Sequence, residues 1–478
     1  MAGIELERIT DYTYGIRQTT DVRMKVPGLV FSSPALVKYL KNDQSLQQVV
    51  NVSMLPGIVG ASMAMPDIHW GYGFPIGGVA AFDAEDGVIS PGGVGYDINC
   101  GVSLIRTDLH YDQLKPKLRQ ITDNLFKNVP SGMGSTSSKV RQSDIDDILK
   151  NGLSWCTENN MATKSDVMNT EENGSMKYAM SDAISAEAKK RGLKQIGTLG
   201  AGNHFLEIQI VDRIYDEKVA GYFGIKRTGQ VTIMIHTGSR GLGHQVATDF
   251  IRNMNSGEHD VVMHPVDRQL VSAKINSKLG EKYTGAMNAA ANFGFVNRQV
   301  IVHNVRKTFS ADFPDSEIEL MYSLAHNIAK REKHRVDGEY RDLVVHRKGA
   351  TRAFSSVDMT GDAAYSKYGH PVLIPGDMGT ASYILVGKEG NDSISFGSSC
   401  HGAGRKLSRK KSMETFNSSE VIAGLAHKGI YLRAQNRQVV SEEAPGSYKD
   451  IDEVIDAVTG AGLTMPIARL VPVGVVKG

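Results

Sequence analysis

Short runs of alternating or β-branched hydrophobic residues predict several strands. Residues 205–211 (FLEIQIV) alternate as a half-buried strand does, and the run at 231–235 (VTIMI) ends directly at His236. Close to the C-terminus, residues 470–476 (LVPVGVV) are apolar enough to dock as a strand, which would hold Lys477 in place. We therefore expect β-sheets at the centre of the fold.

Helical periodicity predicts helices between these strands. The expected helices cover residues 181–190, 267–304 and 317–331, the second broken around Gly280 and Gly294. Strands and helices mix without a regular βαβ order, which favours an α+β fold over a doubly wound sheet.

Nothing in the sequence divides the chain into separate domains. It has no internal repeat, no low-complexity tract and no proline-rich linker, although residues 131–143, rich in serine and glycine, predict a mobile surface loop. We therefore predict one large mixed domain over residues 1–478, with central β-sheets flanked by helices and a deep active-site cleft.

The 50 glycines cluster in short, turn-rich blocks. Glycine lets the backbone approach a ligand closely, so such loops suit phosphate or metal sites; tight connections between strands are the alternative. The main blocks are residues 66–78, 91–101, 197–205, 236–244, 375–379 and 397–404.

Charge and composition narrow the class of protein. Lys and Arg number 54 and Asp and Glu 52, a net charge of +2, so any nucleic-acid contact must come from a local patch. Residues 1–8 carry acids where a signal peptide needs a basic segment, and no apolar run approaches the roughly 18 residues of a membrane span. The three cysteines are too few for a disulfide framework and fit a reducing compartment. We expect a soluble, cytoplasmic protein with no membrane association.

Asp97 and Cys100 are the first candidates for chemistry. They lie three apart in a glycine-rich turn, where both side chains can point at one ion. A thiolate and a carboxylate completed by imidazoles suit Zn²⁺, Mn²⁺ or Fe²⁺, whereas a buried free cysteine is the alternative. His204 and His236 lie at strand ends, and His326 lies within a predicted helix and has less support. None of the three belongs to a close-spaced zinc motif, and a lone histidine is usually structural.

His401 lies beside a glycine turn and a group of cations. The cations that follow it are Arg405, Lys406, Arg409, Lys410 and Lys411. An imidazole in this setting suits a phosphate-handling nucleophile or acid/base, and the cations could neutralise backbone phosphates. A solvated basic helix face after a turn explains the same residues equally well.

Familiar nucleotide-binding motifs are missing from the sequence. There is no G-x-x-x-x-G-K-[ST] loop, and Phe205 occupies the third glycine position of a dinucleotide fingerprint that starts at Gly200. Residues 335–338 (RVDG) are similar to the K-x-D-G of lysine nucleotidyltransferases, but arginine cannot deprotonate to become a nucleophile.

An ordered set of segments resembles the RtcB family of RNA-splicing ligases. Each segment alone is weak, but together they follow the family's order across nearly the full chain. The segments are residues 67–78, 95–101, 202–207, 236–244, 325–327, 346–352, 400–405 and 472–478.

The resemblance implies a GTP- and Mn²⁺-dependent RNA ligase. It would join 3′-phosphate or 2′,3′-cyclic-phosphate ends to 5′-hydroxyl ends, in tRNA splicing or RNA repair, with archease as an activator. Two Mn²⁺ ions would share the thiolate of Cys100. The ligands of one ion would be Asp97, Cys100 and His204, and those of the other Cys100, His236 and His326.

The resemblance also implies that His401 is the catalytic nucleophile, which takes GMP from GTP before an RNA-(3′)pp(5′)G intermediate forms. The residues around GMP would be Asn203, His204, Phe205, Leu206, Glu207, His326, Asn327, Pro375, Gly376, Asp377, Met378, Ser382, His401, Gly402, Ala403, Gly404 and Lys477. One difference from the family pattern is Asp377, which stands where we expect serine.

Two other functions fit parts of the same sequence. A metal-dependent RNA cyclic phosphodiesterase or nuclease would need the Asp/Cys/His cluster, but neither a nucleophilic His401 nor a guanine site. A non-catalytic RNA-binding protein would use the cations after Arg405, and it would tolerate the loss of Cys100 and His236.

Overall fold

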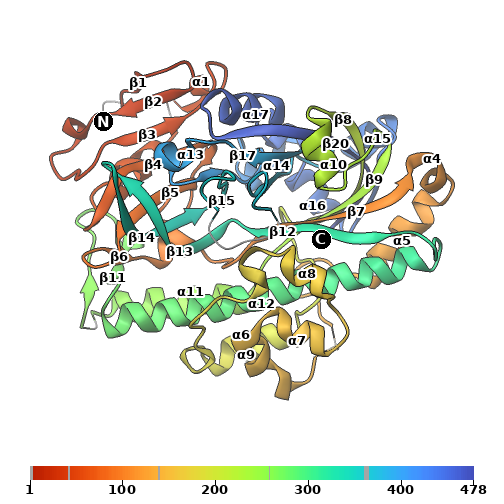
Figure 1. The fold of residues 1–478 in the computed structure, drawn as a ribbon, viewed down its shortest axis with the longest axis horizontal. Helices are drawn as coiled ribbons and strands as arrows, with labels where there is room; N and C mark the ends of the chain where they lie inside the picture. The colour runs from red at the N-terminus through yellow and green to blue at the C-terminus, as the bar shows by residue number, and fades with distance from the viewer. Residues whose placement is uncertain (1–3, 41–42, 138–139, 258, 360–364) are drawn as a thin grey trace.

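The computed structural model describes residues 4–40, 43–137, 140–257, 259–359 and 365–478. It confirms the predicted α+β fold, because nearly all strand pairs are antiparallel and the helices pack around the sheets (Figure 1). The described pairs that run parallel are β3 with β4 (Gly28–Phe31 with Ile58–His69) and β19 with β20 (Tyr431–Ala434 with Thr464–Lys477). Within the described residues, no helix is long and apolar enough to cross a membrane.

Two large sheets form the centre of the fold. The strands of the seven-stranded sheet are, in spatial order, β1 (Glu7–Arg8), β2 (Thr13–Ile16), β3, β4, β5 (Ile76–Asp83), β14 (Glu339–Lys348) and β13 (Asn327–Val336). The strands of the eight-stranded sheet are β12 (Ile318–Ala325), β7 (Gly101–His110), β9 (Gln230–Thr237), β8 (Phe205–Ile214), β20, β17 (Ser382–Gly387) and β16 (Pro371–Ile374), with β19 beside β20. The small sheets are β10 (Val261–Val262), β11 (Ser272–Lys274) and β6 (Val88–Ile89), and the pair β15 (Ala350–Arg352) and β18 (Ser398–Cys400).

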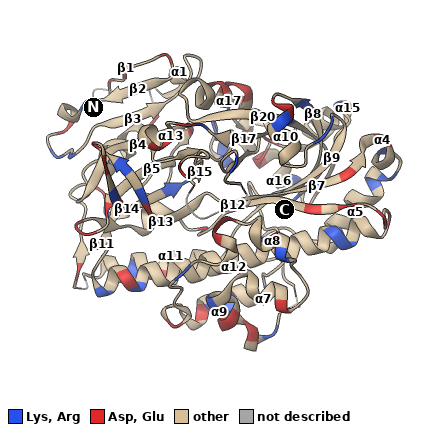
Figure 2. Ribbon diagram, viewed as in Figure 1, with Lys and Arg blue, Asp and Glu red and all other residues tan. Residues whose placement is uncertain are grey.

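Helices cover the sheets, and α12 (Lys278–Ser310) is the longest of those described. In Figure 1 α12 passes beneath both large sheets. The other principal helices are α2 (Ser45–Val52), α5 (Leu118–Asn128), α6 (Ile145–Asn151), α7 (Leu153–Glu158), α9 (Ala186–Leu193), α11 (Arg240–Asn255), α14 (Arg409–Thr415), α15 (Ser418–His427), α16 (Arg437–Glu442) and α17 (Ile451–Gly460). Acidic and basic residues are interspersed over these elements, as the small net charge predicts (Figure 2).

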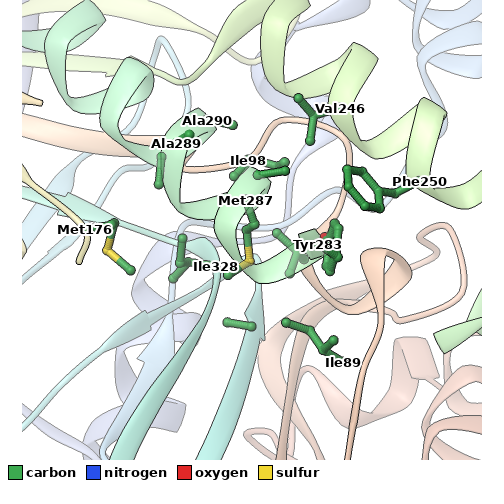
Figure 3. Packing of buried hydrophobic residues seen from close by; sticks show 14 of the residues in the cluster. Ile89, Ile98, Met176, Val246, Phe250, Tyr283, Met287, Ala289, Ala290 and Ile328 are labelled. Carbon is green, nitrogen blue, oxygen red and sulfur yellow. The ribbon is translucent and has the colours of Figure 1, made fainter. Parts of the chain in front are cut away.

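The largest hydrophobic cluster forms around α12. Figure 3 shows Tyr283 and Met287 of this helix among side chains from distant parts of the chain, including Ile98, Val246 and Phe250. The rings of Phe250 and Tyr283 lie 5.2 Å apart. This packing anchors the segment that follows α3 (Pro91–Val94), and that segment contains Asp97 and Cys100.

The predicted break of this helix is wrong, because α12 is continuous and begins only at Lys278. The hydroxyl of Ser277 caps it by accepting from the backbone N–H of Gly280, 3.1 Å away. Both glycines allow another part of the chain to pack directly against the backbone of α12. A Cβ at Gly280 would lie 2.1 Å from the carbonyl oxygen of Lys274, and one at Gly294 would lie 3.1 Å from Asn99. Gly294 therefore lets α12 lie directly against the turn that carries Cys100.

The helix predicted over residues 317–331 is also wrong. The segment forms β12 and the first half of β13, with His326 between them. On β13 the inward-facing positions Lys330, Glu332 and His334 are charged or polar, so hydrophobicity does not reveal their period of two. Buried ion pairs compensate these side chains, as between Lys330 and Glu171, whose charged atoms lie 2.5 Å apart.

The remaining predictions from the pattern have mixed outcomes. The strands at 231–235 and 470–476 are confirmed as parts of β9 and β20. Residues 205–211 form most of β8, and along this stretch the strand is buried on both faces rather than half-buried. Of the helix predicted at 181–190, residues 181–183 form a 3₁₀ turn and residues 186–190 belong to α9, with two extended residues between them. In the predicted loop at 131–143, residues 138 and 139 lie outside the described residues, and the mobility of the rest stays a prediction.

Candidate active site

A cavity of about 750 Å³ lies where strands of the two large sheets end, as the predicted cleft requires. His326 occupies the crossing from β12 of one sheet to β13 of the other. In the eight-stranded sheet, Lys477 pairs with Phe205, and Phe205 pairs with His236 on the next strand. Gly101 pairs with both Thr237 and Ala325, so its neighbour Cys100 lies at the ends of the two strands that lead to His236 and His326.

The five predicted metal ligands meet on one wall of this cavity. The Sγ atom of Cys100 lies 3.4 Å from Nε2 of both His204 and His236. Nε2 of His236 lies 3.2 Å from Nε2 of His326, and Nε2 of His204 lies 3.0 Å from Oδ2 of Asp97. The potential ligand atoms form two groups, and within each group all of these atoms lie within 4.8 Å of one another. One group is Asp97, Cys100 and His204, and the other is Cys100, His236 and His326, so Cys100 belongs to both.

Backbone interactions fix the turn that carries these ligands. The backbone N–H of Cys100 donates to the carbonyl oxygen of Asp97 at 2.9 Å, and Asn99 between them has a φ of 54°. The fully buried guanidinium of Arg298 donates to the Asn99 carbonyl at 2.7 Å and to the Asn99 side-chain oxygen at 2.9 Å. The same guanidinium donates to the Thr237 carbonyl at 3.1 Å, which joins this turn to the strand of His236.

Burial controls the protonation of this cluster. It lowers the pKa of His236 and His326 well below the ordinary value, so both imidazoles are neutral at pH 7. Burial also raises the pKa of the Cys100 thiol. For Asp97, burial opposes ionisation, but the hydrogen bond and charge of His204 outweigh it and lower the pKa. Neutral imidazoles and an ionised carboxylate are the states that a metal ion needs.

His401 lies next to this cluster and is held by a buried carboxylate. Its Nδ1 lies 2.5 Å from Oδ2 of Asp67, which also accepts from the His401 backbone N–H at 3.1 Å. The rings of His326 and His401 lie 4.7 Å apart. Asp67, on β4, is fully buried. The sequence gives no role to Asp67, although it belongs to a glycine-rich block, because 334 residues separate it from His401.

Most of the predicted GMP residues line the same cavity. They are Asn203, His204, Phe205, His326, Asn327, Pro375, Gly376, Asp377, Met378, His401, Gly402, Ala403, Gly404 and Lys477. Glu207 and Ser382 are buried behind this wall, where the side-chain amide of Gln209 donates to Glu207 at 2.9 Å and to Ser382 at 3.0 Å. The side chain of Leu206 points away, into a separate hydrophobic cluster.

Lys477 is buried despite its place at the end of the chain. Its Nζ lies 3.7 Å from Oε2 of Glu443 and 5.6 Å from the centre of the Phe205 ring. Its carbonyl oxygen accepts from the backbone N–H of Gln435 at 3.0 Å. Burial raises the pKa of the neighbouring Glu207 to about 8. The C-terminal strand therefore holds an ammonium group among carboxyl groups at the cavity wall.

Asp377 uses its carboxylate to build its own turn. Oδ1 of Asp377 accepts from the backbone N–H of Gly379 at 2.8 Å, and its backbone N–H donates to the Thr380 hydroxyl at 3.0 Å. Burial raises the pKa of Asp377. A serine hydroxyl can cap such a turn in the same way, which explains why either residue suits this position.

The cations after His401 divide into two groups. Arg405, Lys406 and Arg409 line the cavity, where Arg405 forms an ion pair with Glu443 at 2.9 Å and Arg409 forms one with Glu442 at 3.3 Å. Lys410 and Lys411 are exposed on α14. The two exposed lysines therefore fit the solvated helix face, whereas phosphate binding by the cations of the cavity stays a prediction.

The α+β fold and this cluster define the chain as a candidate metalloenzyme. In it, a histidine held by a carboxylate adjoins a site made of a thiol, imidazoles and a second carboxylate. A family model described as "tRNA-splicing ligase RtcB" matches residues 48–478. The protein of that name from Thermococcus kodakarensis is 50% identical over 480 residues, covering 99% of both chains. The protein of the same name from Archaeoglobus fulgidus is 48% identical and covers 100% of both chains. That from Methanococcus maripaludis is 47% identical and covers 98% of this chain and 99% of its own. The chain therefore belongs to the RtcB family.

Proposed function

We propose that the chain is an RNA ligase that joins 3′-phosphate or 2′,3′-cyclic-phosphate ends to 5′-hydroxyl ends with GTP and Mn²⁺, in tRNA splicing and RNA repair. Family membership supports the ligase activity. The observation that carries the mechanism is the position of His401, whose Nδ1 is held by Asp67 while its ring adjoins His326 of the candidate metal cluster.

The residues of the cluster fit two Mn²⁺ ions. Asp97, Cys100 and His204 would hold one ion, and Cys100, His236 and His326 would hold the other. Nε2 of each of the three histidines faces Sγ of Cys100 or a neighbouring imidazole at 3.2–3.4 Å, so an ion bound through Nε2 would take the place of these contacts. When bound, the ions would neutralise phosphate charge and activate water for opening a cyclic phosphate.

Asp67 prepares His401 for nucleophilic attack. Because the carboxylate accepts the Nδ1 proton, the lone pair of the imidazole is on Nε2. Nε2 attacks the α-phosphorus of GTP, a P–N bond forms, and the P–O bond to the β-phosphate breaks to release pyrophosphate. The product is GMP linked to His401 as a phosphoramidate.

Two further transfers complete ligation. An oxygen of the RNA 3′-phosphate attacks the phosphorus of the adduct, the P–N bond breaks, and RNA-(3′)pp(5′)G forms. The 5′-hydroxyl of the second RNA then attacks the former 3′-phosphate and releases GMP, so the phosphate at the junction comes from the RNA. The cavity cations Lys406 and Arg409 would contact the RNA phosphates.

The guanine end of the nucleotide would lie toward Lys477. An ammonium group donates to the acceptor oxygen of guanine, where adenine has a donor amine. Asp377 would line this site, with Glu207 and Ser382 buried behind its wall. We assign RNA as the partner and archease as an activator on the basis of the family. A metal-binding thiolate needs reducing conditions, which supports a cytoplasmic location.

The deciding experiment is guanylylation of purified protein with Mn²⁺ and GTP labelled at the α-phosphate. We expect label that is acid-labile and base-stable, as in a phosphoramidate, in the wild type and in the surface control His427→Ala. His401→Ala should lose both the adduct and ligation while keeping its Mn²⁺. An adduct that maps to a lysine refutes the assignment, and cyclic-phosphate opening without any adduct supports the phosphodiesterase alternative.

A further inference from the structure

Four aromatic side chains on the cavity wall have no part in the chemistry above. Trp70, Tyr72, Tyr96 and His244 all line the cavity that contains the metal cluster, and we call them the aromatic ledge. Tyr96 directly precedes Asp97, so the ledge adjoins the group formed by Asp97, Cys100 and His204. That group is the one that does not include His326, the histidine that contacts His401.

The rings of the ledge are arranged for stacking. Tyr96 and His244 are stacked, with centroids 4.7 Å apart and planes inclined by 25°. Tyr72 meets Tyr96 edge to face at 5.2 Å. His244, on α11, is exposed at the outer end of this row. A further flat ring placed on His244 would continue the stack.

Trp70 presents a large apolar surface to the cavity. It is 53% exposed, whereas the chain's other tryptophan, Trp155, is 3% exposed in the core. The turn that carries Trp70 is rigid, because the next residue, Gly71, exchanges two hydrogen bonds with the buried side chain of Gln48, at 3.0 and 2.6 Å. The backbone that carries the indole is therefore fixed at the edge of the cavity.

A buried lysine fixes the other side of this turn. Nζ of Lys348 donates to the carbonyl oxygens of Tyr72 at 2.5 Å, Phe74 at 3.2 Å and Gly92 at 3.1 Å. The ammonium group ties the ledge to the segment that leads into Asp97. A rigid aromatic surface loses little entropy when it binds a ligand, which is the property of a preformed site.

We infer that the aromatic ledge is a base-stacking subsite, which binds an unpaired nucleobase of the RNA close to the end being joined. The inference rests on the proposed function, since it assumes an RNA substrate in this cavity. Every base has a flat π-face, and proteins bind single-stranded RNA by stacking bases on aromatic side chains. A ligase that accepts many RNA ends needs contacts that do not depend on sequence, and stacking supplies them.

Binding is measured by the fluorescence anisotropy of dye-labelled RNA, which reports equally on every variant; quenching of the exposed Trp70 is a second readout in the wild type, where the other indole is buried. Full-length protein with Mn²⁺ is titrated with two short single-stranded RNAs, one ending in a 5′-hydroxyl and one in a 3′-phosphate. Each RNA is compared with the same strand lacking its terminal base. The proteins are wild type, Trp70→Ala, Trp70→Phe, Trp70→Leu and the control Tyr340→Ala, which removes an aromatic ring that is 77% exposed away from the cavity.

We expect Trp70→Ala to weaken binding of at least one strand by about 5- to 150-fold, the usual value of one stacked base. In the wild type, removal of the terminal base should cost a similar factor, and in Trp70→Ala it should cost little more. Trp70→Phe should bind better than Trp70→Leu, and Tyr340→Ala should match the wild type. The strand that shows the difference identifies which RNA end meets the ledge.

Three results would overturn the subsite. They are wild-type affinity in Trp70→Ala, equal binding of the intact and base-free strands by the wild type, and equal binding by Trp70→Leu and Trp70→Phe. The last comparison remains decisive if Trp70→Ala does not fold. Guanylylation of the wild type in the absence of RNA tests the proposed function separately. If the GMP adduct forms but binding does not depend on the terminal base, the subsite alone is wrong. If binding depends on the base but no adduct forms, the proposed function is wrong.

Discussion

Asp67→Asn tests the chemical core of the mechanism with an isosteric change. The carboxylate is fully buried and serves two donors, the Nδ1–H of His401 at 2.5 Å and the His401 backbone N–H at 3.1 Å. An amide at this position keeps one oxygen that can accept from Nδ1, but it loses the charge. We therefore expect the protein to fold and to form the GMP adduct more slowly.

The size of the effect depends on how the amide is oriented. A hydrogen bond to a charged group contributes roughly 1.5–3 kcal/mol and a neutral one about 1 kcal/mol. The loss of charge alone therefore costs about 0.5–2 kcal/mol, or about 2- to 30-fold in rate. If the amide NH₂ faces His401 instead, the ring carries its proton on Nε2 and the nucleophile is lost. The same substitution in the serine-protease triad lowers kcat about 10⁴-fold for this reason. We expect a decrease between these limits for Asp67→Asn.

The assay is the single-turnover rate of adduct formation at saturating GTP and Mn²⁺. Asp392→Asn is a matched control, because Asp392 accepts from Nδ1 of His334 at 2.5 Å and from the Arg335 backbone N–H at 3.3 Å, away from the cavity. The control should change stability and leave the adduct rate near that of the wild type. A wild-type adduct rate in folded Asp67→Asn would refute the role of Asp67.

Three further predictions concern the rest of the site. Cys100→Ala should lower the Mn²⁺ content measured by elemental analysis, because one thiolate serves both ions. The control Cys156→Ala should keep its full Mn²⁺ content, because Cys156 is buried in a separate part of the core. A full Mn²⁺ content in Cys100→Ala contradicts the bridging role. Lys477→Ala should weaken GTP binding about 10- to 100-fold, the value of one charged hydrogen bond, and narrow the preference for GTP over ATP in competition assays; unchanged selectivity makes the lysine structural. Burial raises the pKa of Glu207 to about 8, so the folded state retains a proton that the unfolded state releases above about pH 4.3. The stability that this carboxyl group contributes is therefore present at low pH and is lost as the pH rises through 8. Denaturant unfolding should show Glu207→Gln gaining stability over the wild type between pH 5 and 8, and a pH-independent difference would contradict the shift.

Local sequence determined those parts of the site that lie close together in the chain. Asp97 and Cys100 share one turn, and the apolar run before Lys477 forms the strand that holds this lysine. The antiparallel α+β character follows from the mixture of short strands and helices. The ordered glycine-rich segments, which allow the backbone to pack closely, are the reason that the resemblance to the RtcB family is visible without a structure.

Only the tertiary structure decided which distant residues meet. His326 lies in a segment whose inward-facing charges conceal the strand period, and it reaches Cys100 because β12 pairs with β7. Asp67 reaches His401 across 334 residues through the packing of β4 beside the loop that follows β18. Strand register and close packing between elements are long-range properties, which no local pattern of hydrophobic residues contains. The sequence by itself therefore determines the chemical groups and much of the local structure, and the pairing of strands determines that these groups form a single site.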